Sequence, residues 1–278
     1  MKNFNTIIPL LTIFLLISCS GEKKEIIEKY DDGTPKVVRY FDGRGKDKKK
    51  IREQIFWDNG NLKKDISYDG NKKHGDFFSY YEDSSLESEK KYVLNRENGQ
   101  TKYWHENGQL KYEYNVVSGL IIGQKTSWYD NGNMEEEKLF IEGKEEGPQS
   151  GWHDNGEKKY EYTAIKGRKN GLFTLWFRNG QKEIEFSCVN DTVNGHLTSW
   201  YMNGNKRLDF NFEQFKFEGA QKSWDGDGNL IYHFENYLQD TTKSKQQVYF
   251  GNYEAWLSDH WELIKYVFDK WGLISAIK

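Results

Sequence analysis

Six histidines and two cysteines are the residues of this chain most able to carry metal or nucleophilic chemistry. His105 and His153 occupy the same position of a 24-residue repeat, two units apart. Two hairpins of a continuous sheet span ~20 Å, whereas a zinc ligand lies ~2 Å from its metal, so this pair cannot share an ion. The sequence also lacks the HExxH, CxxC, GxSxG and phosphate-loop patterns. We therefore predict neither a metal site nor a cofactor.

The carboxylates and the cysteines do not single out a catalytic site either. The repeat places Asp and Glu at the same positions in every copy, so no pair is distinguished for acid–base work. Cys188 stands where other copies carry Val116, Phe140, Ala164 and Phe212, which is typical of a buried small hydrophobe rather than a nucleophile. We predict that the protein is not an enzyme and has no small-molecule substrate. A hydrolase with its site in the insertion or the tail is the alternative.

Three markers share the 24-residue period. One glycine series follows a short turn, at Gly60, Gly108, Gly132, Gly156, Gly180, Gly204 and Gly228, with Ser84 in place of the missing member. A second series comprises Gly75, Gly99, Gly123, Gly147, Gly171, Gly195 and Gly219. Tryptophans stand five residues after members of the second series, at Trp104, Trp128, Trp152, Trp176, Trp200 and Trp224. Each unit is therefore predicted to be a strand, a tight turn, a second strand and a Gly-containing connection.

The turn of each hairpin is predicted to be a three-residue loop such as Arg178-Asn179-Gly180. Asn-Gly alone suggests a two-residue type I′ turn, but one residue of register sends every side chain to the other face. A three-residue loop places Trp176 opposite the apolar set of Ile184 and Phe186, and burying these groups together is favourable. The loop glycine then has positive φ. Ser84 marks the weakest hairpin.

The other face is predicted to be polar and to carry two charged columns. One alternates in sign: Lys63, Glu87, Lys111, Glu135, Lys159, Glu183 and Arg207. The other is wholly acidic and repulsive unless compensated: Asp65, Glu89, Glu113, Glu137, Glu161, Glu185 and Asp209. A stripe of rings follows the tryptophans and is expected on the same face: Tyr81, His105, Tyr129, His153, Phe177 and Tyr201. Rings beside charges are typical of protein-recognition surfaces, so this aromatic stripe is our predicted partner-binding site. Covering the second face of the sheet is the alternative role.

The N-terminus indicates export and lipidation. Lys2 precedes the apolar run of residues 7–17, which is too short for a comfortable transmembrane helix and fits a signal peptide. Residues 16–19 (LISC) resemble a bacterial lipobox, which implies lipid on Cys19. An ordinary secretory signal is the alternative. Because only Cys188 then remains free, no intrachain disulfide can form. Ser20 after Cys19, rather than Asp, resembles lipoproteins sorted to an outer membrane.

The amino-acid composition limits which folds and which partners are possible for this chain. The 278 residues are 16% aromatic but only 36% apolar, which favours a thin, extended core. A net charge of −3 with no uniformly basic element argues against nucleic-acid binding. Residues 43–52 (GRGKDKKKIR) break the period and are expected to form a solvated surface loop, with an anionic docking patch as the alternative.

The chain divides into four segments. Residues 1–18 are the predicted signal peptide, 19–29 a lipidated tether, 30–234 about nine β-hairpin units, and 235–278 a C-terminal cap. Apolar residues at helical spacing from Tyr253 to Trp271 predict an amphipathic helix between Asn252 and Gly272, which would cover the open end of the sheet. A partner-binding helix is the alternative. The expected fold is all-β: a single-layer antiparallel β-hairpin solenoid with a capping α-helix.

The unit W-[YF]-x-N-G, with K-N-G or a similar sequence ahead of it, resembles the MORN-repeat variant of bacterial proteins of the YwqK-type antitoxin family. The resemblance covers residues 30–234, and its best copies are KNGLFTLWFRNGQKEIEF and VNGHLTSWYMNGNKRLDF. It implies a repeat scaffold and, for the antitoxin family, a toxin partner. With the lipobox, it leads us to expect a non-catalytic, lipid-anchored protein of the cell envelope that binds another protein. An antitoxin or immunity protein is the alternative.

Overall fold

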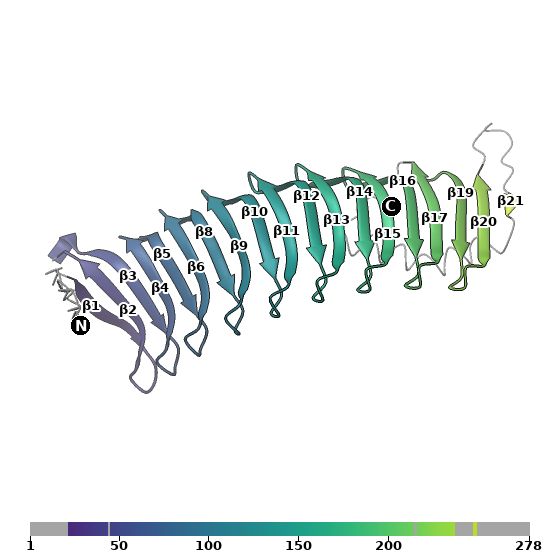
Figure 1. The fold of residues 1–278 in the computed structure, drawn as a ribbon. Coiled ribbons are helices and arrows are strands. Elements are labelled where there is room, and N and C mark those ends of the chain that lie inside the picture. The colour runs from purple at the N-terminus through teal and green to yellow at the C-terminus, as the bar shows by residue number, and fades with distance from the viewer. Residues whose placement is uncertain (1–21, 44, 214–215, 237–246, 249–278) are drawn as a thin grey trace, which may run out of the picture.

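The computed structural model describes residues 22–43, 45–213, 216–236 and 247–248, and these form one open antiparallel sheet (Figure 1). Apart from the 3-10 helix η1 (Gly45–Asp47), all regular structure in these residues is strand. Neighbouring strands pair in chain order, so the hairpins stand side by side in a single elongated layer. The predicted all-β hairpin repeat is confirmed. The predicted signal peptide, Cys19 and the C-terminal helix lie outside the described residues.

The 21 described strands vary from two to nine residues in length. Their bounds are β1 (Lys23–Lys29), β2 (Pro35–Asp42), β3 (Lys49–Phe56), β4 (Leu62–Asp69), β5 (Lys72–Tyr80), β6 (Leu86–Val93), β7 (Arg96–Glu97), β8 (Gly99–Trp104), β9 (Leu110–Val117), β10 (Leu120–Trp128), β11 (Met134–Ile141), β12 (Lys144–Trp152), β13 (Lys158–Ile165), β14 (Arg168–Trp176), β15 (Lys182–Val189), β16 (Thr192–Trp200), β17 (Lys206–Glu213), β18 (Lys216–Phe217), β19 (Gly219–Trp224), β20 (Leu230–Asn236) and β21 (Gln247–Val248).

One end of each hairpin is the three-residue loop that the sequence predicts. Between β14 and β15, the Gly180 amide donates to the Phe177 carbonyl at 3.0 Å, and the Phe177 amide donates to the Gln181 carbonyl at 2.8 Å. Gly180 has φ of +80°, where a side chain would be strained. The same pair of bonds closes the loop at Ser84, which adopts φ of +73° without being glycine. We call this side of the sheet the loop edge.

The other end of most hairpins is a two-residue turn. Both central residues have positive φ, as a type I′ turn requires, in Leu94-Asn95, Ser118-Gly119, Glu142-Gly143, Lys166-Gly167 and Asn190-Asp191. The flanking residues pair directly, as Ile141 does with Lys144. The sequence predicts only a Gly-containing connection here, because two of these five turns contain no glycine and the type of turn is not marked in every copy. We call this side the turn edge.

The predicted position of the tryptophans is wrong. Leu175 pairs with Ile184 but Trp176 pairs with Lys182, and a register shift lies between the two pairs. Glu183 is therefore an extra residue on β15, and this second bulge reverses the register that the loop alone would impose. Leu175 is 6% exposed, whereas Trp176 is half-buried on the opposite face. We call the face of Leu175 and Ile184 the apolar face, and the face of Trp176 the tryptophan face.

The acidic column lies on the tryptophan face, and cations compensate it. Lys182 Nζ is 2.5 Å from Glu185, and Lys206 Nζ is 2.7 Å from Asp209. The same two lysines lie over the indoles of Trp200 and Trp224 in the following hairpin, at 5.9 Å from each ring centroid. One lysine thus neutralises an acid in its own hairpin and covers a tryptophan of the next.

The apolar face changes character along the sheet. Over β13–β17 it holds the buried cluster, in which Phe173, Phe186 and Phe210 are 0% exposed. Nearer the N-terminus, lysines and tyrosines alternate instead. Tyr103 and Tyr112 have ring centroids 4.4 Å apart, and Lys90 Nζ lies 4.6 Å from the Tyr103 ring. The uniform apolar face that the best copies suggest is therefore confined to the C-terminal hairpins.

Buried glutamines close gaps in the backbone ladder. The Gln149 side chain is 0% exposed; its Oε1 accepts from the Leu139 amide at 3.1 Å and its Nε2 donates to the Leu139 carbonyl at 3.2 Å. Gln221 makes the same two bonds to Asn211, both at 3.3 Å. The register shift beside Leu139 interrupts backbone pairing, and the amide side chain replaces the missing partner.

The N-terminal boundaries differ from those predicted. Residues 23–29, assigned to the tether, form β1 and pair with β2, so the sheet begins before Tyr30. Residues 49–52 of the expected basic loop belong to β3. Their cations have partners in the sheet: Lys50 Nζ lies 3.3 Å from the Tyr68 ring centroid, and Arg52 forms an ion pair with Asp65. These partners hold residues 49–52 in a strand, so β3 begins at Lys49.

Replacing Ser84 by glycine is expected to stabilise the hairpin of β5 and β6. A residue with a side chain lowers the stability of the fold by ~1–2 kcal/mol when its φ is positive. Glycine removes this strain, but its greater freedom in the unfolded chain offsets ~0.5–1 kcal/mol of the gain. The net gain should be ~0.5–1 kcal/mol, measured as a higher denaturant midpoint. Ser84→Ala is the control and should give no gain. An equal gain from alanine would show that the serine hydroxyl, not the backbone, limits this loop.

Candidate functional site

Residues of the aromatic stripe fasten each hairpin to the next one at the loop edge. Their side chains reach the backbone carbonyl of the tryptophan 23 residues later. The bonds are Tyr81 Oη to Trp104 O at 2.7 Å, His105 Nε2 to Trp128 O at 2.8 Å, Tyr129 Oη to Trp152 O at 2.8 Å, His153 Nε2 to Trp176 O at 2.8 Å and Tyr201 Oη to Trp224 O at 3.0 Å. The stripe therefore has a structural role in addition to any recognition.

The two histidines of the stripe must act as donors. A carbonyl oxygen carries no hydrogen, so Nε2 of His105 and of His153 holds the proton of each bond. The neutral rings therefore carry their hydrogen on Nε2 and present Nδ1 as an acceptor. Phe177 has no donor at this position and cannot make the bond. Earlier copies do make it, since Tyr30 Oη donates to the Phe56 carbonyl at 2.8 Å.

The stripe lies on a different face from the one predicted. Alternation along β14 puts Phe177 on the side of Leu175, at the loop end of the apolar face. The sign-alternating column accompanies it there, because its residues are the bulged ones. Ser127, which pairs with Tyr112 on the apolar face, donates to Glu135 at 3.2 Å. The Arg207 guanidinium lies 5.2 Å from the Tyr201 ring centroid. Of the two charged columns, only the acidic one lies on the tryptophan face.

The loop asparagines form a second row of bonds between hairpins. Asn107 Nδ2 donates to the Asp130 carbonyl at 2.6 Å, while its Oδ1 accepts from the Gln109 amide at 3.0 Å within the loop. Equivalent bonds reach the next hairpin from Asn131 and Asn155, each at 2.7 Å. These asparagines do not have positive φ. Their recurrence before the glycine was the sequence signal for this role, because the turn itself does not require it.

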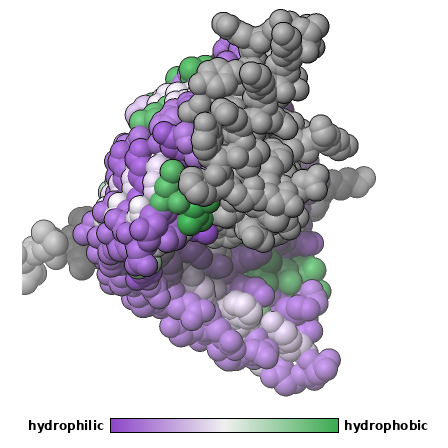
Figure 2. Space-filling model, turned by 90° about the vertical axis from the view of Figure 1, so that its right-hand side faces the viewer, coloured by the Kyte–Doolittle hydropathy of each residue, from purple (hydrophilic) through white to green (hydrophobic). Residues whose placement is uncertain are grey.

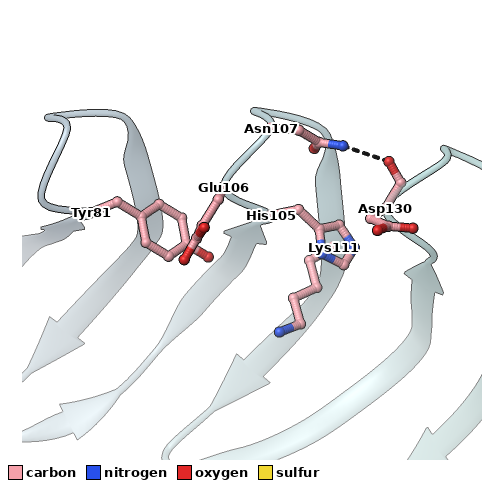
Figure 3. Close-up of a pocket in the computed structure, with 6 residues that line it drawn as sticks. All are labelled: Tyr81, His105, Glu106, Asn107, Lys111 and Asp130. Carbon is pink, nitrogen blue, oxygen red and sulfur yellow. Dashed lines mark hydrogen bonds between the residues drawn. The ribbon is translucent and has the colours of Figure 1, made fainter.

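A shallow pocket of about 390 Å³ opens at the loop edge between these hairpins (Figure 3). It is lined by Tyr81, His105, Glu106, Asn107, Lys111 and Asp130. Two predicted stripe residues thus meet in one pocket, while the other four stripe residues lie outside it. The lining mixes one lysine with two acids, and the amide of Asn107 is already bonded to the Asp130 carbonyl (Figure 3).

Tyr129 of the stripe and Cys188 both have a raised pKa, which makes them less reactive. Burial, with the charge of Glu135 as a smaller cause, raises the pKa of Tyr129. Burial likewise raises the pKa of Cys188 to about 11. The Cys188 thiol is 1% exposed and donates to the Gly171 carbonyl at 3.4 Å. A thiol in this state is neutral at physiological pH.

The turn edge carries a row of exposed β-branched residues that the sequence analysis did not single out. Val93, Val117, Ile141, Ile165 and Val189 end successive strands at 24-residue spacing and are 43%, 49%, 56%, 47% and 49% exposed. Alternation along the strands puts them on the tryptophan face. We call them the apolar edge column. Elsewhere the visible surface is mainly hydrophilic, with separate apolar patches (Figure 2). The fixed 24-residue spacing of the apolar edge column was the sequence signal that could have revealed it.

Two further properties concern the described residues alone. Among residues 22–43, 45–213, 216–236 and 247–248, no three His, Cys, Asp or Glu side chains are grouped as metal ligands would be. Within the same residues, no helix is long and apolar enough to cross a bilayer.

Comparison with known families supports the repeat class. The family described as MORN repeat variant matches residues 73–93 and 97–117. The two matched segments begin 24 residues apart, and each covers one hairpin with its loop, β5 and β6 in the first and β8 and β9 in the second. MORN repeats are commonly membrane- or protein-binding modules and are typically not catalytic. A search of curated proteins found no match.

Two solved structures align with most of this chain at low similarity. The structure titled TcdB2-TccC3 aligns over 81% of this chain and 20% of its own, at 9% identity and a TM-score of 0.21. The Photorhabdus luminescens Tc holotoxin pore aligns over 78% of this chain and 14% of its own, at 11% identity and a TM-score of 0.20. The chain spans a fifth or less of the length of either one. At these TM-scores neither likeness bears on the fold or the function.

Removing the hydroxyl of Tyr129 should weaken the contact between its hairpin and the next. Tyr129→Phe keeps the ring and deletes the bond to the Trp152 carbonyl, at an expected cost of ~1 kcal/mol in a denaturant melt. Phe177→Tyr is the matched reverse change, which supplies the missing donor and should raise stability by ~0.5–1 kcal/mol. If both variants left the melting midpoint unchanged, the fastening role of the stripe would be refuted.

Proposed function

We propose that the protein is a non-catalytic, lipid-anchored envelope protein that holds another protein along the edge of its sheet. The lipobox resemblance at Cys19 supports the anchor, and the MORN repeat match supports a binding module. Side-chain bonds fix each hairpin to the next, so the sheet can present a row of groups at constant spacing. A partner that contacts several hairpins at once gains avidity from that spacing.

The apolar edge column is the observation that carries this proposal. Five β-branched side chains, each close to half exposed, stand on consecutive hairpins from β6 to β15. Hairpins in a sheet are ~10 Å apart, so the column runs ~40 Å. Exposed apolar rows of this length mark interaction surfaces more often than chance exposure of single residues. Leu120 and Leu172, 51% and 52% exposed, widen it near the turn edge.

The aromatic stripe is the second candidate surface. Tyr81, His105, Tyr129, His153, Phe177 and Tyr201 are all half-buried, and the polar atoms of five of them already bond the next hairpin. A partner there would contact ring edges and the charges beside them, as at many protein interfaces. The turn edge is favoured because its apolar groups have more surface left to bury.

An antitoxin or immunity role is the narrower alternative within the same proposal. Its support is the MORN repeat variant match, which agrees with the resemblance to the YwqK-type family. It requires the partner to be a toxin and the chain to neutralise it. The general scaffold requires only that the partner be a protein held at the envelope, on the outer membrane where the host has one.

Lipidation is tested with labelled palmitate in the producing cell. The wild-type chain should incorporate the label and sediment with membranes, and Cys19→Ala should do neither because the thiol that accepts the lipid is gone. Cys188→Ala is the matched control and should label normally, since its thiol is buried in the sheet. Label on the Cys19→Ala chain would rule out the anchor.

Partner contact is tested by placing a photo-crosslinking amino acid at position 141 or at position 129 in cells. A discrete adduct from Ile141 is expected, because its side chain is the most exposed of the apolar edge column. Thr163, exposed on the same face, is the control position and should give no adduct. An adduct from position 129 alone would move the surface to the aromatic stripe. If neither position captures a protein, the scaffold proposal fails, and capture of a toxin would select the antitoxin role.

A further inference from the structure

Three lysines on the apolar face stand where later hairpins carry buried apolar residues. The lysines are Lys73, Lys90 and Lys125, and their counterparts in the 24-residue register are, in the same order, Val193, Phe186 and Phe173. Each counterpart is 0% exposed, whereas all three lysines are half-buried. Lysine at such a position forfeits apolar burial and keeps its ammonium group near water. These positions therefore depart from the pattern that stabilises the C-terminal hairpins.

Aromatic rings link the lysines into one row. Lys73 Nζ lies 5.5 Å from the ring centroid of Phe77 and 5.1 Å from that of Tyr92. Lys90 Nζ lies 5.6 Å from the Phe77 centroid and 4.6 Å from that of Tyr103. Two ammonium groups thus share one phenylalanine, and each contact is within the range of a cation–π interaction.

The row continues across β9 to β10. The ring centroids of Tyr103 and Tyr112 are 4.4 Å apart. Lys125 Nζ lies 5.5 Å from the Tyr112 centroid and 5.9 Å from that of Tyr114. We call the three lysines and these five rings the lysine–tyrosine ladder. It crosses β5, β6, β8, β9 and β10, which pair in that order and span ~19 Å.

The positive charge of the ladder exceeds the negative charge beside it. None of its three lysines, nor Lys64 on the adjoining β4, forms an ion pair with a carboxylate of the described residues. Two carboxylates lie close by: burial, with smaller contributions that include the charges of Glu87 and Glu97, raises the pKa of Tyr112 to about 12. Four ammonium groups beside two carboxylates leave a positive surface that attracts anions.

The acidic column limits which anions can approach the ladder. Glu89 precedes Lys90 on β6, so alternation along the strand puts it on the opposite face of the same single layer. Charges interact over ~8 Å at physiological ionic strength, and the whole chain has a net charge of −3. A wide polyanion, such as a nucleic acid or an anionic membrane, is repelled by the column as well as attracted by the ladder. A short acidic segment of a protein meets the ladder alone.

The rings favour a segment that carries apolar residues as well as acids, because tyrosine packs against apolar groups while its hydroxyl stays near water. We propose that the lysine–tyrosine ladder binds an acidic segment of a partner protein, with carboxylates on its lysines and apolar side chains on its rings. The ladder lies on the opposite face from the apolar edge column. The inference therefore depends neither on the lipid anchor nor on contact at position 141.

The test uses the full-length protein and a fluorescein-labelled peptide of alternating glutamate and leucine, with fluorescence anisotropy as the readout. The peptide should bind, and added salt should weaken the binding because ion pairs are screened. A peptide with glutamine in place of glutamate should not bind. Lys73→Gln with Lys90→Gln and Lys125→Gln should weaken binding of the acidic peptide ~10- to 100-fold, since three ion pairs are lost.

The matched control removes three lysines from the tryptophan face: Lys91→Gln, Lys102→Gln and Lys182→Gln. These lysines already have carboxylate partners in the sheet. The net charge changes equally, but the affinity should stay within ~2-fold of wild type because distant charges are screened. Lys90→Gln alone covers the case in which the triple ladder variant does not fold, and it should weaken binding ~2- to 5-fold. Lys90→Arg keeps the charge and should bind as wild type does.

Three results overturn the proposal: no binding of the acidic peptide, equal binding of the glutamine peptide, or an unchanged affinity in a folded ladder variant. Displacement of the peptide by phosphatidylglycerol vesicles or by a single-stranded oligonucleotide also overturns it, because the ladder would then be a site for a polyanion. A crosslink at position 141 reports on the other face of the sheet, so its failure and the failure of this proposal are distinguishable.

Discussion

Hydrogen bonds between a side chain and a backbone carbonyl 23 residues later hold neighbouring hairpins of this sheet at a constant offset. Backbone pairing joins strands, but it permits slippage wherever a face lacks a strong pattern. At the loop edge, a ring at one position and an asparagine two residues later each donate to carbonyls of the next hairpin. A shift of one residue in the pairing of two hairpins would break both rows of hydrogen bonds at once. The 24-residue period therefore follows from the need to keep donors level with carbonyls, in addition to the length of two strands and two turns.

Much of the fold follows from the sequence because its determinants are local. A glycine at fixed spacing requires positive φ, and this predicts the three-residue loop and the weak loop at Ser84. The tryptophan face could not be predicted in the same way. It depends on whether Glu183 pairs or bulges opposite Leu175 and Trp176, and the alternation of apolar residues along β15 is the same in either case. The turn edge was missed for the converse reason, since Asn190-Asp191 adopts the turn without the glycine that would signal it.

The two candidate sites also differ in how far the sequence alone could identify them. The aromatic stripe is visible in the sequence as a pattern of residue types, but its hydrogen bonds show that the pattern serves the sheet itself. The apolar edge column was also visible as a spacing. Valine and isoleucine at strand ends are so common that only the exposure of Ile141 and Ile165 separates them from core residues. In a repeat protein, periodicity identifies structural positions first, and solvent exposure is needed to identify binding ones.

The fastening bonds at the loop edge differ from most side-chain contacts in what a substitution can remove. The acceptor in each bond is a backbone carbonyl of the next hairpin, so no change of side chain in that hairpin takes it away. Only the donor depends on the residue type. One side chain in each unit therefore decides whether two neighbouring hairpins are joined at this point, and the pairing of β15 with β16 shows that the sheet continues past Phe177, which has no donor.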